Sequence, residues 1–457
     1  MFKKTLANLF VSIQHYGVKP ILSELKKTEF YNDNLIKDYQ SKKLQKLVLH
    51  AYNNVPFYYD LFNRYKVKPE NIRSVDDLKK LPILEKETIQ SNYSRLLATN
   101  VSRTYTRKTS GSTGAPLKIT YDKQNKLIEI ALMLQFLSNI GKEIGSTEIN
   151  LWGRPGNSIN ERILRYIKGF IYNKKLKDVY QFNDQDFSDL ARELSNSPNI
   201  HLRGFTQAIY LLACKLRDNN NPINIDAVSV TAEKLFEHQR ILIGKYLTKN
   251  LYDQYGCGEV NSIAFECNIH NGLHHSFQHS VLEILDKSGE ITNDSGDVVV
   301  TNLDNYAMPL IRYRNGDIIK LSHKSCSCGR SGKLIKSIEG RLYDFIEGAN
   351  GEIIHSAFLD HILVESSLMD EYNIQEIRII QTSIDEIVVQ YVAKKEIPEN
   401  CFRDFQEKLI YRLGSLNIIY EKKLHINETT NGKRRFVVPL NEFLKNPSVY
   451  DVKKYPH

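Results

Sequence analysis

Between residues 199 and 259 the sequence repeats one order of elements: a short apolar strand, a turn and then a helix. The stretches are NIHLRGFTQAIYLLACKL and IDAVSVTAEKLFEHQRILIGKYL, and KNLYDQYGCGE then begins as a strand that runs into a loop. This alternation predicts a largely parallel sheet with helices on its faces. Ligands bind such sheets at the carboxyl ends of the strands, so we expect the functional site in the loops that follow them.

The regions on either side of this alternation have other patterns. Residues 25 to 66 place apolar side chains three and four apart, which predicts helices, until Pro56 interrupts the pattern. Residues 280 to 340 contain HSVLEILD, GDVVVTNL and DIIKLSH, short pieces separated by turns that predict strands. After IEGR at 338 to 341, the sequence predicts two strands, a helix and a further strand.

The sequence therefore predicts an α/β fold with two domains, because 457 residues are too many for one ordinary core. We expect a large N-terminal domain over residues 1–339, with mainly parallel sheets and helices. It would include a helical lead-in over 1–95 and a β-rich part over about 280–339. A small, mobile α+β domain would follow over 340–457, with the boundary at Gly340–Arg341.

Composition limits the classes of function. The chain is 41% hydrophobic and 25% charged, as in ordinary globular proteins, and no apolar run is long enough to cross a bilayer. The formal net charge of +9 suits anionic ligands, but the basic residues are spread along the chain without a dense tract, so we do not expect nucleic-acid binding. Six cysteines do not make a disulfide scaffold, so we expect a cytoplasmic protein.

The N-terminal stretch MFKKTLANLFVSIQHYG has apolar residues at helical spacing. Gln14 and His15 interrupt the apolar run and no small-residue cleavage site follows, which argues against a signal peptide. Two alternatives stay open: a helix that rests on a membrane surface, and a helix docked on its own domain, which we favour. The apolar residues are Leu6, Leu9, Phe10 and Ile13.

A stretch rich in glycine and hydroxyl side chains, TSGSTGAP at 109–116, is suited to phosphate binding. Small residues let backbone N–H groups approach a phosphate closely, and hydroxyl groups add further donors. No Lys-Ser or Lys-Thr pair follows the second glycine, so this is not the Walker pattern. Lys118 could add positive charge, or it could face solvent. A flexible loop without a ligand is the alternative.

The order of motifs along the chain gives this stretch a context. TSGSTGAP resembles the phosphate loop of the adenylate-forming, AMP-producing ligases, and four later motifs resemble the other conserved motifs of that superfamily. They are YGCGE at 255–259, IRYRNGD at 311–317, GRLYD at 340–344 and NGKRR at 431–435. HAYNNVPFYYDLF, NLDNYAMPLIRYRNGD and CSCGR are similar to segments of the phenylacetate–coenzyme A ligase family, including members from capsule and surface-polysaccharide loci.

This resemblance implies ATP and Mg²⁺ as ligands, and it assigns a role to individual residues. Tyr255 would stack on adenine, Asp317 would bind the ribose hydroxyls, and Glu259 would hold Mg²⁺. Arg341 would reach a ribose or phosphate oxygen. Thr113, Glu259 and Lys433 would be the catalytic residues, with Lys433 neutralising charge as the carboxylate meets the α-phosphate. The β- and γ-phosphates would lie on Ser110, Gly111, Ser112, Thr113 and Gly114, and Ala232 and Glu233 would border the adenine.

Two positions depart from the superfamily's pattern. Tyr343 stands where the hinge position is often acidic, with Asp344 next, so the pivot of the small domain is not assigned. Asn315 replaces a commoner threonine before Gly316 and Asp317, and we expect this change between polar residues to have little effect.

A separate group of thiols and imidazoles suggests a metal site. ECNIHNGLHH contributes Cys267 and three histidines, and SCSCGR contributes Cys326 and Cys328, which together suit a closed tetrahedral Zn²⁺ site. Some relatives carry a structural zinc at the corresponding positions, and the resemblance favours the set Cys267, His274, Cys326 and Cys328. His270 could replace His274, and reduced buried cysteines without metal are the alternative.

The acyl substrate and its acceptor are less constrained. We expect an ATP-dependent ligase that transfers a small-molecule carboxylate to coenzyme A. An amide ligase that uses an amine acceptor in surface-polysaccharide synthesis, and a non-catalytic nucleotide-binding protein, are the alternatives. The polar stretch NLWGRPGNS lowers our expectation of a plain aryl acid, and a homodimer is compatible with the sequence. Candidate pocket residues are Trp152, Arg154, Arg203, Phe205 and Gln207.

Overall fold

The computed structural model describes most of the chain. The residues described are 5–7, 9–11, 15–108, 117–152, 159–179, 182, 184–197, 199–341, 345–366, 368–427, 435–445 and 447–452.

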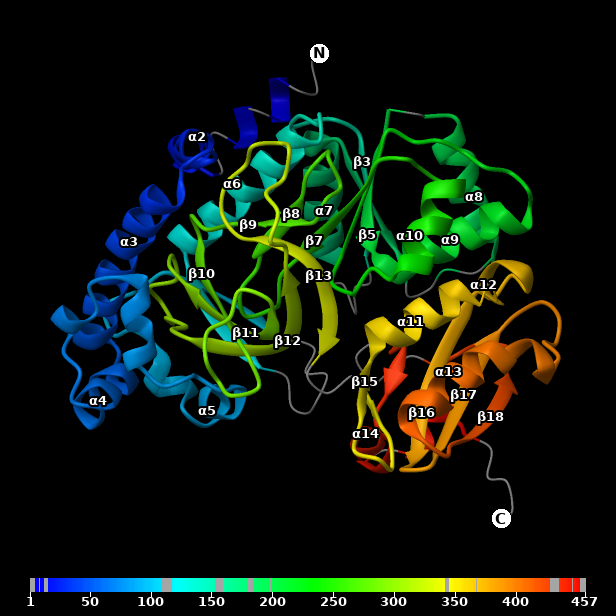
Figure 1. Ribbon diagram of the computed structural model, residues 1–457. Coiled ribbons are helices and arrows are strands. Elements are labelled where there is room, and N and C mark those ends of the chain that lie inside the picture. Colours follow the sequence, from blue (N-terminus) through cyan, green and yellow to red (C-terminus); the bar gives the residue numbers. More distant parts are fainter. Residues whose placement is uncertain are drawn as a thin grey trace.

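One sheet of 11 strands forms the centre of the molecule (Figure 1), in the order β10-β11-β12-β13-β9-β8-β7-β6-β5-β3-β4. The strands from β4 to β7 are parallel, as the alternation of strands and helices predicted. They are β3 (Glu148–Trp152), β4 (Lys174–Asp178), β5 (His201–Phe205), β6 (Ala227–Thr231) and β7 (Leu251–Tyr255).

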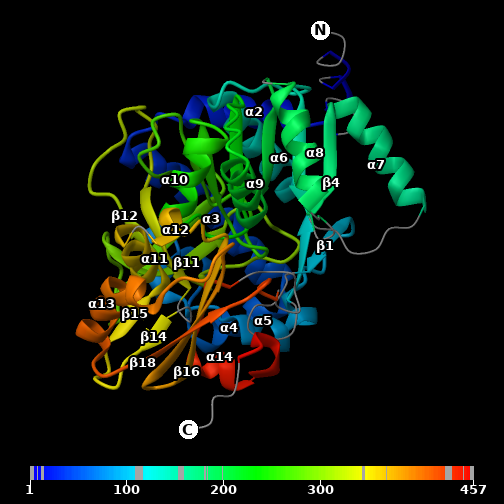
Figure 2. The ribbon, with the colours of Figure 1, turned by 90° about the vertical axis from the view of Figure 1, so that its right-hand side faces the viewer.

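Helices cover both faces of this parallel half. Apolar side chains of α8 (Asp184–Ser195), α9 (Thr206–Asp218) and α10 (Glu237–Tyr246) share a core with one face of the sheet. On the other face, α6 (Lys123–Asn139) packs through Phe136, whose ring lies 6.1 Å from that of Tyr252. A further helix, α7 (Ile159–Tyr172), precedes β4 and projects from the side of the molecule in Figure 2. The carboxyl ends of the parallel strands are thus flanked by helices.

The β-rich region is the antiparallel half of the same sheet. We expected a β-rich part within the large domain. Its strands pair antiparallel, with irregularities in the β11–β12 and β12–β13 pairings, and they join β7 through β8 and β9. The mixed α/β character expected from the sequence is confirmed. The strands are β8 (Ala264–Glu266), β9 (Leu273–His275), β10 (Ser280–Leu285), β11 (Ser295–Asn302), β12 (Tyr313–Leu321) and β13 (Leu334–Arg341).

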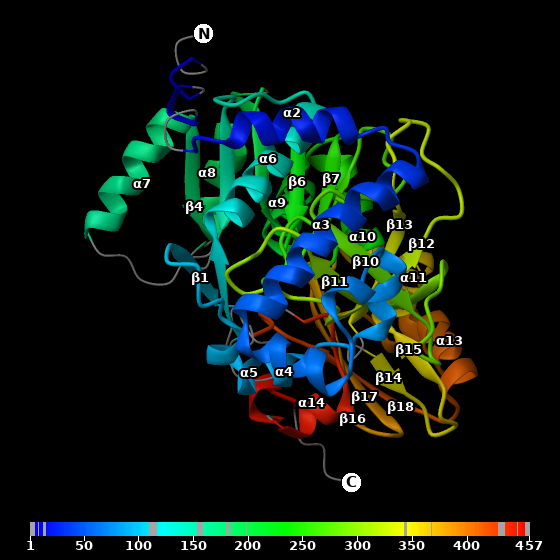
Figure 3. The same ribbon diagram turned by 90° about the vertical axis from the view of Figure 1, so that its left-hand side faces the viewer.

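The helical lead-in packs in two places (Figure 3): its helix at Val18–Thr28 lies on α6, and its later helices pack against this antiparallel half. Pro56 occupies the first turn of α4, where its missing N–H costs nothing. The buried Tyr58 hydroxyl donates to the Pro309 carbonyl at 3.0 Å and accepts from the Ile311 N–H at 3.0 Å. The helices are α2 (Val18–Thr28), α3 (Asp33–Asn54), α4 (Pro56–Arg64) and α5 (Lys86–Ser91), with short 3₁₀ turns at Pro69–Asn71, Val75–Lys80 and Tyr93–Leu96.

The described N-terminal residues are helical and in contact with the rest of the fold. Ala7 and Val11 are buried, and the ring of Phe10 lies 5.8 Å from that of Tyr172. Leu9 remains 57% exposed. These contacts agree with the docked helix that we favoured, while Ile13 lies outside the described residues. Across the part of the chain that the structure describes, every helix is too short or too polar to span a membrane.

The C-terminal part has its own four-stranded sheet, in the order β18-β17-β16-β19. It contacts the large part through an apolar core to which α10 contributes Leu242 and Ile243, and α11 contributes Leu359 and Ile362. The elements are β14 (Phe345–Glu347), β15 (Ile353–His355), α11 (Ser356–Glu365), α12 (Leu368–Glu371), β16 (Glu376–Ser383), β17 (Glu386–Val392), α13 (Arg403–Leu413), β18 (Asn417–Lys422), β19 (Val437–Val438) and α14 (Leu440–Lys445), with 3₁₀ turns at Glu399–Phe402 and Pro447–Tyr450.

Candidate functional site

Two antiparallel strands hold the ends of the glycine- and serine-rich stretch. The strands are β1 (Thr104–Lys108) and β2 (Lys118–Asp122), and Lys108 pairs with Lys118 at the open end of the hairpin. Lys118 is exposed and its ammonium lies 4.9 Å from the centre of the Tyr93 ring, which matches the solvent-facing alternative. The predicted phosphate-binding residues Ser110, Gly111, Ser112, Thr113 and Gly114 lie outside the described residues.

Side chains from two separate motifs meet at the end of β7. The Tyr255 hydroxyl donates to Asp317 Oδ2 at 2.8 Å, and Asn315 Nδ2 donates to both the Tyr255 hydroxyl and Asp317 Oδ2 at 2.9 Å. In the sheet order, β7 and β12 are separated by β8, β9 and β13. A flat sheet would hold them about 19 Å apart, so the sheet must curve here. The contact brings the expected adenine and ribose residues together.

The protonation of Tyr255 suits this arrangement. Burial raises the pKa of its hydroxyl well above the ordinary value, and the charge of Asp317 raises it further. The hydroxyl therefore keeps its proton and donates it to the carboxylate. Asn315 completes the triangle as a donor to both oxygens. We expected the change to asparagine to matter little, and the motif gave no sign that its amide bridges the two residues.

Glu259 lies close to this triangle and is 9% exposed. Its carboxylate contacts the Tyr313 hydroxyl and the Cys257 thiol, and its charge contributes, after burial, to raising the pKa of both groups. The thiol of Cys257 is therefore held protonated and unreactive. A buried carboxylate beside a hydroxyl is an oxygen donor set of the kind that Mg²⁺ prefers, so Glu259 fits the expected role.

Ala232 and Glu233 lie in the loop that follows β6. Ala232 is exposed and has a φ of 71°, an unusual conformation for a residue other than glycine. The carboxylate of Glu233 accepts from the Gln207 N–H at 2.9 Å and so caps the first turn of α9. The side chain of Gln207 bonds to Gln239 at 3.1 Å. Glu233 and Gln207 thus hold this loop on the helix, and Ala232 lies at its surface.

The segment that carries Lys433 lies outside the described residues, but both of its ends are described. The buried guanidinium of Arg378 on β16 donates to the Asn427 carbonyl at 2.5 Å and to the Arg435 carbonyl at 3.2 Å. The ring of Phe436 lies 4.6 Å from that of Phe236, four residues after Ala232. The ends of the Lys433 segment therefore lie beside the loop after β6.

Four further positions named from the sequence lie wholly or partly outside the described residues. Tyr343 and Asp344 lie outside the described residues, as do Arg154 and the side chain of Arg341. The backbone of Arg341 pairs with Asp317 in the register of β12 and β13, which places this residue on the strand next to the Tyr255 triangle. Arg378 was not anticipated, because a buried arginine in a strand carries no motif.

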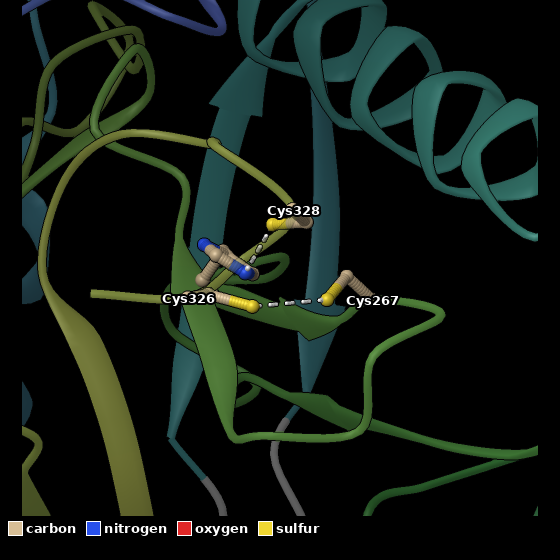
Figure 4. A group of neighbouring side chains, drawn as sticks. Cys267, Cys326 and Cys328 are labelled. Carbon is tan, nitrogen blue, oxygen red and sulfur yellow. Dashed lines mark hydrogen bonds between the residues drawn. The ribbon is translucent and has the colours of Figure 1, made fainter. Parts of the chain in front are cut away.

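Cys267, His274, Cys326 and Cys328 converge on one point, with one ligand atom of each within 4.8 Å of every other (Figure 4). The Sγ atoms of Cys267 and Cys326 are 3.7 Å apart, and Cys328 Sγ lies 3.3 Å from His274 Nε2. A tetrahedron with zinc–sulfur bonds of about 2.3 Å has sulfur–sulfur edges of about 3.8 Å. The donor set therefore fits Zn²⁺.

The same geometry separates His274 from His270. His270 Nδ1 lies 3.2 Å from Glu266, its ring lies 4.9 Å from that of Tyr252, and it is not one of the four groups that converge. Burial and the charge of Arg330 lower the pKa of His274 to about 4, so its imidazole is neutral, as a metal ligand must be. The set with His274 is therefore the one that the geometry favours.

Comparisons with known proteins agree with this fold. Residues 346–439 match the model of the CapK C-terminal domain. Protein CapK of Staphylococcus aureus is 23% identical over 94% of this chain and 96% of its own. The phenylacetate–coenzyme A ligase of Thermus thermophilus is 24% identical over 81% of this chain and 83% of its own.

Solved structures extend the comparison to three dimensions. 2-Hydroxyisobutyryl-CoA ligase in the postadenylation state superposes with a TM-score of 0.70 at 16% identity, covering 92% of this chain and 93% of that chain. The same enzyme in the thioesterification state gives a TM-score of 0.58 at 17% identity, covering 92% and 94%. The chain is thus a homologue of Protein CapK and the phenylacetate–coenzyme A ligases, and it has the adenylate-forming ligase fold.

Proposed function

We propose that this protein is an AMP-forming ligase that activates a carboxylate with ATP and transfers the acyl group to coenzyme A. The observation that carries the proposal is the hydrogen-bonded triangle of Tyr255, Asn315 and Asp317, which adjoins the buried Glu259. The hairpin that holds the phosphate-loop sequence and the two ends of the Lys433 segment support it. Relatives that bear the name phenylacetate–coenzyme A ligase support the acceptor.

The reaction has two steps. A carboxylate oxygen attacks the α-phosphorus of ATP, and pyrophosphate leaves with the electron pair of the broken P–O bond. The thiol of coenzyme A then attacks the acyl carbon and loses its proton, and AMP leaves. Because the protein contributes mainly position and charge in the first step, its groups need only hold the phosphates and the carboxylate in line.

Each residue has one task in this scheme. Asp317 accepts from the ribose hydroxyls while Tyr255 and Asn315 fix its orientation. Glu259 would hold Mg²⁺, which when bound offsets phosphate charge. Thr113 donates to a terminal phosphate, and Lys433 brings positive charge to the α-phosphate. Ser110, Gly111, Ser112 and Gly114, in the same loop as Thr113, also bind the terminal phosphates. Ala232, Glu233 and Arg341 border the nucleotide.

The thiol and imidazole cluster would hold a structural Zn²⁺ through Cys267, His274, Cys326 and Cys328. Four protein ligands leave no open position, so the ion would contribute to stability and not to the reaction. The described cysteines are all free thiols, which supports a reducing compartment such as the cytoplasm.

A second candidate is an ATP-dependent amide ligase that uses an amine acceptor in capsule or surface-polysaccharide synthesis. The similarity to Protein CapK over 94% of this chain is compatible with it. Both candidates share the first step. Only the first makes a free thioester with coenzyme A, while the second makes an amide directly from the adenylate.

Carboxylate-dependent exchange of pyrophosphate into ATP tests the shared step, with aryl acids, amino acids, dicarboxylic acids and uronic acids as substrates. We expect Lys433→Ala to suppress exchange by about a hundredfold or more, as removal of one stabilising charge does in other enzymes. Transfer from a supplied acyl-AMP should continue. Lys445→Ala, on the exposed end of α14, is the matched control.

Two results would overturn these assignments. Absence of exchange with every acid would favour a non-catalytic nucleotide-binding protein. Equal loss of both steps in Lys433→Ala would remove this lysine from its role in the first step. Thioester formation with coenzyme A, compared with amide formation from amino sugars, then separates the two acceptors.

A further inference from the structure

The face of the parallel sheet that packs on α6 is unusually polar. His201 Nε2 bonds to the Ser229 hydroxyl at 2.8 Å, and Glu148 accepts from Lys174 at 3.0 Å and from Asn150 at 2.9 Å. The opposite face of the same strands carries the apolar residues that pack on α8, α9 and α10. A sheet face between helices is normally apolar, so this polarity calls for a ligand or a function.

Arg203 lies in the middle of this polar face, on β5. Its NH2 donates to Gln254 Oε1 at 3.1 Å. Within the described part of the chain, its buried Nε has no hydrogen-bond partner, and neither has Gln254 Nε2. Among the described side chains, no carboxylate lies within ion-pair distance of Arg203. The nearest acidic group is Glu148, whose charge already faces Lys174 and His201.

Arg203 is half-buried, and a guanidinium that is partly removed from water without a counter-ion is energetically costly. Burial lowers the pKa of Arg203, which is the expected effect of removing its charge from water. The Trp152 ring lies 5.7 Å from the guanidinium carbon, and its cation–π attraction offsets part of the hydration free energy that the guanidinium loses. A negative ligand would supply the remainder. The unpartnered amide of Gln254 adds a second donor beside the guanidinium.

The position of these groups connects them with the proposed site. Trp152 and Phe205 are the last residues of β3 and β5, and Gln254 directly precedes Tyr255. The rings of Trp152 and Phe205 lie 4.6 Å apart and form an apolar wall beside the cation. The carboxyl ends of these parallel strands lie at the same end of the sheet (Figure 1), which is where ligands of parallel sheets bind.

We propose that Arg203 and Gln254 bind a second anionic group of the carboxylate that the enzyme activates, so that the acyl substrate is a dicarboxylic acid. This inference rests on the function proposed above and names its substrate class. The near carboxylate reacts at the nucleotide, the carbon skeleton lies against Trp152 and Phe205, and the far carboxylate pairs with the guanidinium. The planar donor fork of arginine suits a carboxylate.

Matched pairs of acids test the proposal in the pyrophosphate exchange assay. Adipate is compared with hexanoate, and 4-carboxyphenylacetate with phenylacetate. We expect the wild-type enzyme to prefer the diacid in at least one pair. Arg203→Met, which keeps the length of the side chain but not its charge, should lower the kcat/KM ratio of diacid to monoacid by about a hundredfold. Gln254→Leu should lower it by about tenfold.

Arg192→Met is the matched control, because Arg192 lies on the surface of α8 with an ion pair to Asp189 at 3.5 Å. It should leave the ratio unchanged. An equal ratio in wild type and Arg203→Met would overturn the proposal. So would a wild-type preference for monoacids, or for acids that carry hydroxyl groups in place of the second carboxylate.

Thermal unfolding supplies a readout that a purely structural arginine would not give. Arg203→Met should melt no lower than wild type, since the variant removes a half-buried charge that has no ion-pair partner among the described side chains. The diacid should raise the melting temperature of wild type but not of the variant. A lower melting temperature with unchanged selectivity would assign Arg203 a structural role. If no acid supports exchange, the proposed function fails, while the diacid-dependent stabilisation still decides on binding at Arg203.

Discussion

At the scale of single residues, Asn315 is the most informative position, because its amide joins Tyr255 to Asp317. We expect Asn315→Ala to raise the KM for ATP by about tenfold or more, since a hydrogen bond to a charged group contributes about 1.5–3 kcal/mol. The carboxylate of Asp317 would lose one donor and part of its orientation. Steady-state kinetics with varied ATP measure the effect.

Asn250→Ala is a suitable control, because Asn250 is exposed and its side-chain amide donates to the Asp226 carbonyl. If Asn315→Ala left the KM for ATP unchanged while lowering the melting temperature, the triangle would be structural and not part of the nucleotide site. Asn315→Thr, which restores a polar side chain, should recover part of the affinity.

The motifs predicted which residues share the nucleotide site, but they did not predict the hydrogen bonds between those residues. Tyr255 and Asp317 were expected at one nucleotide, and the structure joins them directly. Asn315 could not be weighed from the sequence, because its effect depends on the curvature that brings β12 to β7. Arg203 was a candidate pocket residue. The sequence could not show that no described carboxylate lies within ion-pair distance of its guanidinium, because that depends on how distant strands pack.

At the scale of elements, the thiol and imidazole cluster joins two connections of the antiparallel half. One lies between β8 and β9, and the other between β12 and β13. We expect purified protein to contain one zinc per chain. Cys328→Ser should lose the metal and melt several degrees lower, because a structural site contributes its binding energy to folding. Metal analysis and thermal unfolding measure both.

Cys401→Ser is the control, since Cys401 lies in the C-terminal part and its thiol contacts the Tyr372 hydroxyl. It should keep the metal. A protein purified without zinc that gains no stability when zinc is added would contradict the assignment. Pyrophosphate exchange should persist in Cys328→Ser at temperatures below its unfolding transition, because none of the four cluster residues is assigned to the proposed nucleotide site.

Local patterns predicted five elements of the parallel half and, in the C-terminal part, β16, β17, α13 and β18. β5, α9, β6, α10 and β7 follow the alternation of the sequence, because each element carries its own periodicity. The sequence did not predict that the β-rich strands extend the same sheet, since pairing between distant strands leaves no local signal. Arg378, which ties both ends of the Lys433 segment, was missed for the same reason.

At the scale of the whole molecule, the two parts meet beside the loop after β6. Phe236 in that loop packs on Phe436, and the C-terminal end of α9 also contacts the small part, because Arg217 donates to the Asn373 carbonyl at 2.9 Å. The two proposed steps need different groups near the acyl carbon, so we expect the small part to change its position between them. A contact between the two parts that forms in only one of these positions then favours that position, and it changes how much of the protein occupies each.

We expect Phe236→Ala and Phe436→Ala each to slow acyl-AMP formation by about two- to tenfold, the range that corresponds to the stabilisation of one aromatic pair. The double variant should be no slower than either single variant, because both remove the same contact. Transfer from a supplied acyl-AMP should be unchanged or faster, since the arrangement for the first step is weakened. Rapid-quench measurement of each step separates the two effects.

Phe443→Ala is the matched control, because Phe443 packs on Tyr450 within the C-terminal part and makes no ring contact with the large part among the described residues. It should slow neither step selectively. Additive losses in the double variant would mean that the two rings act independently. Equal slowing of both steps in all three variants would show that the ring pair only stabilises the fold, and the two-position account would then lose its structural basis.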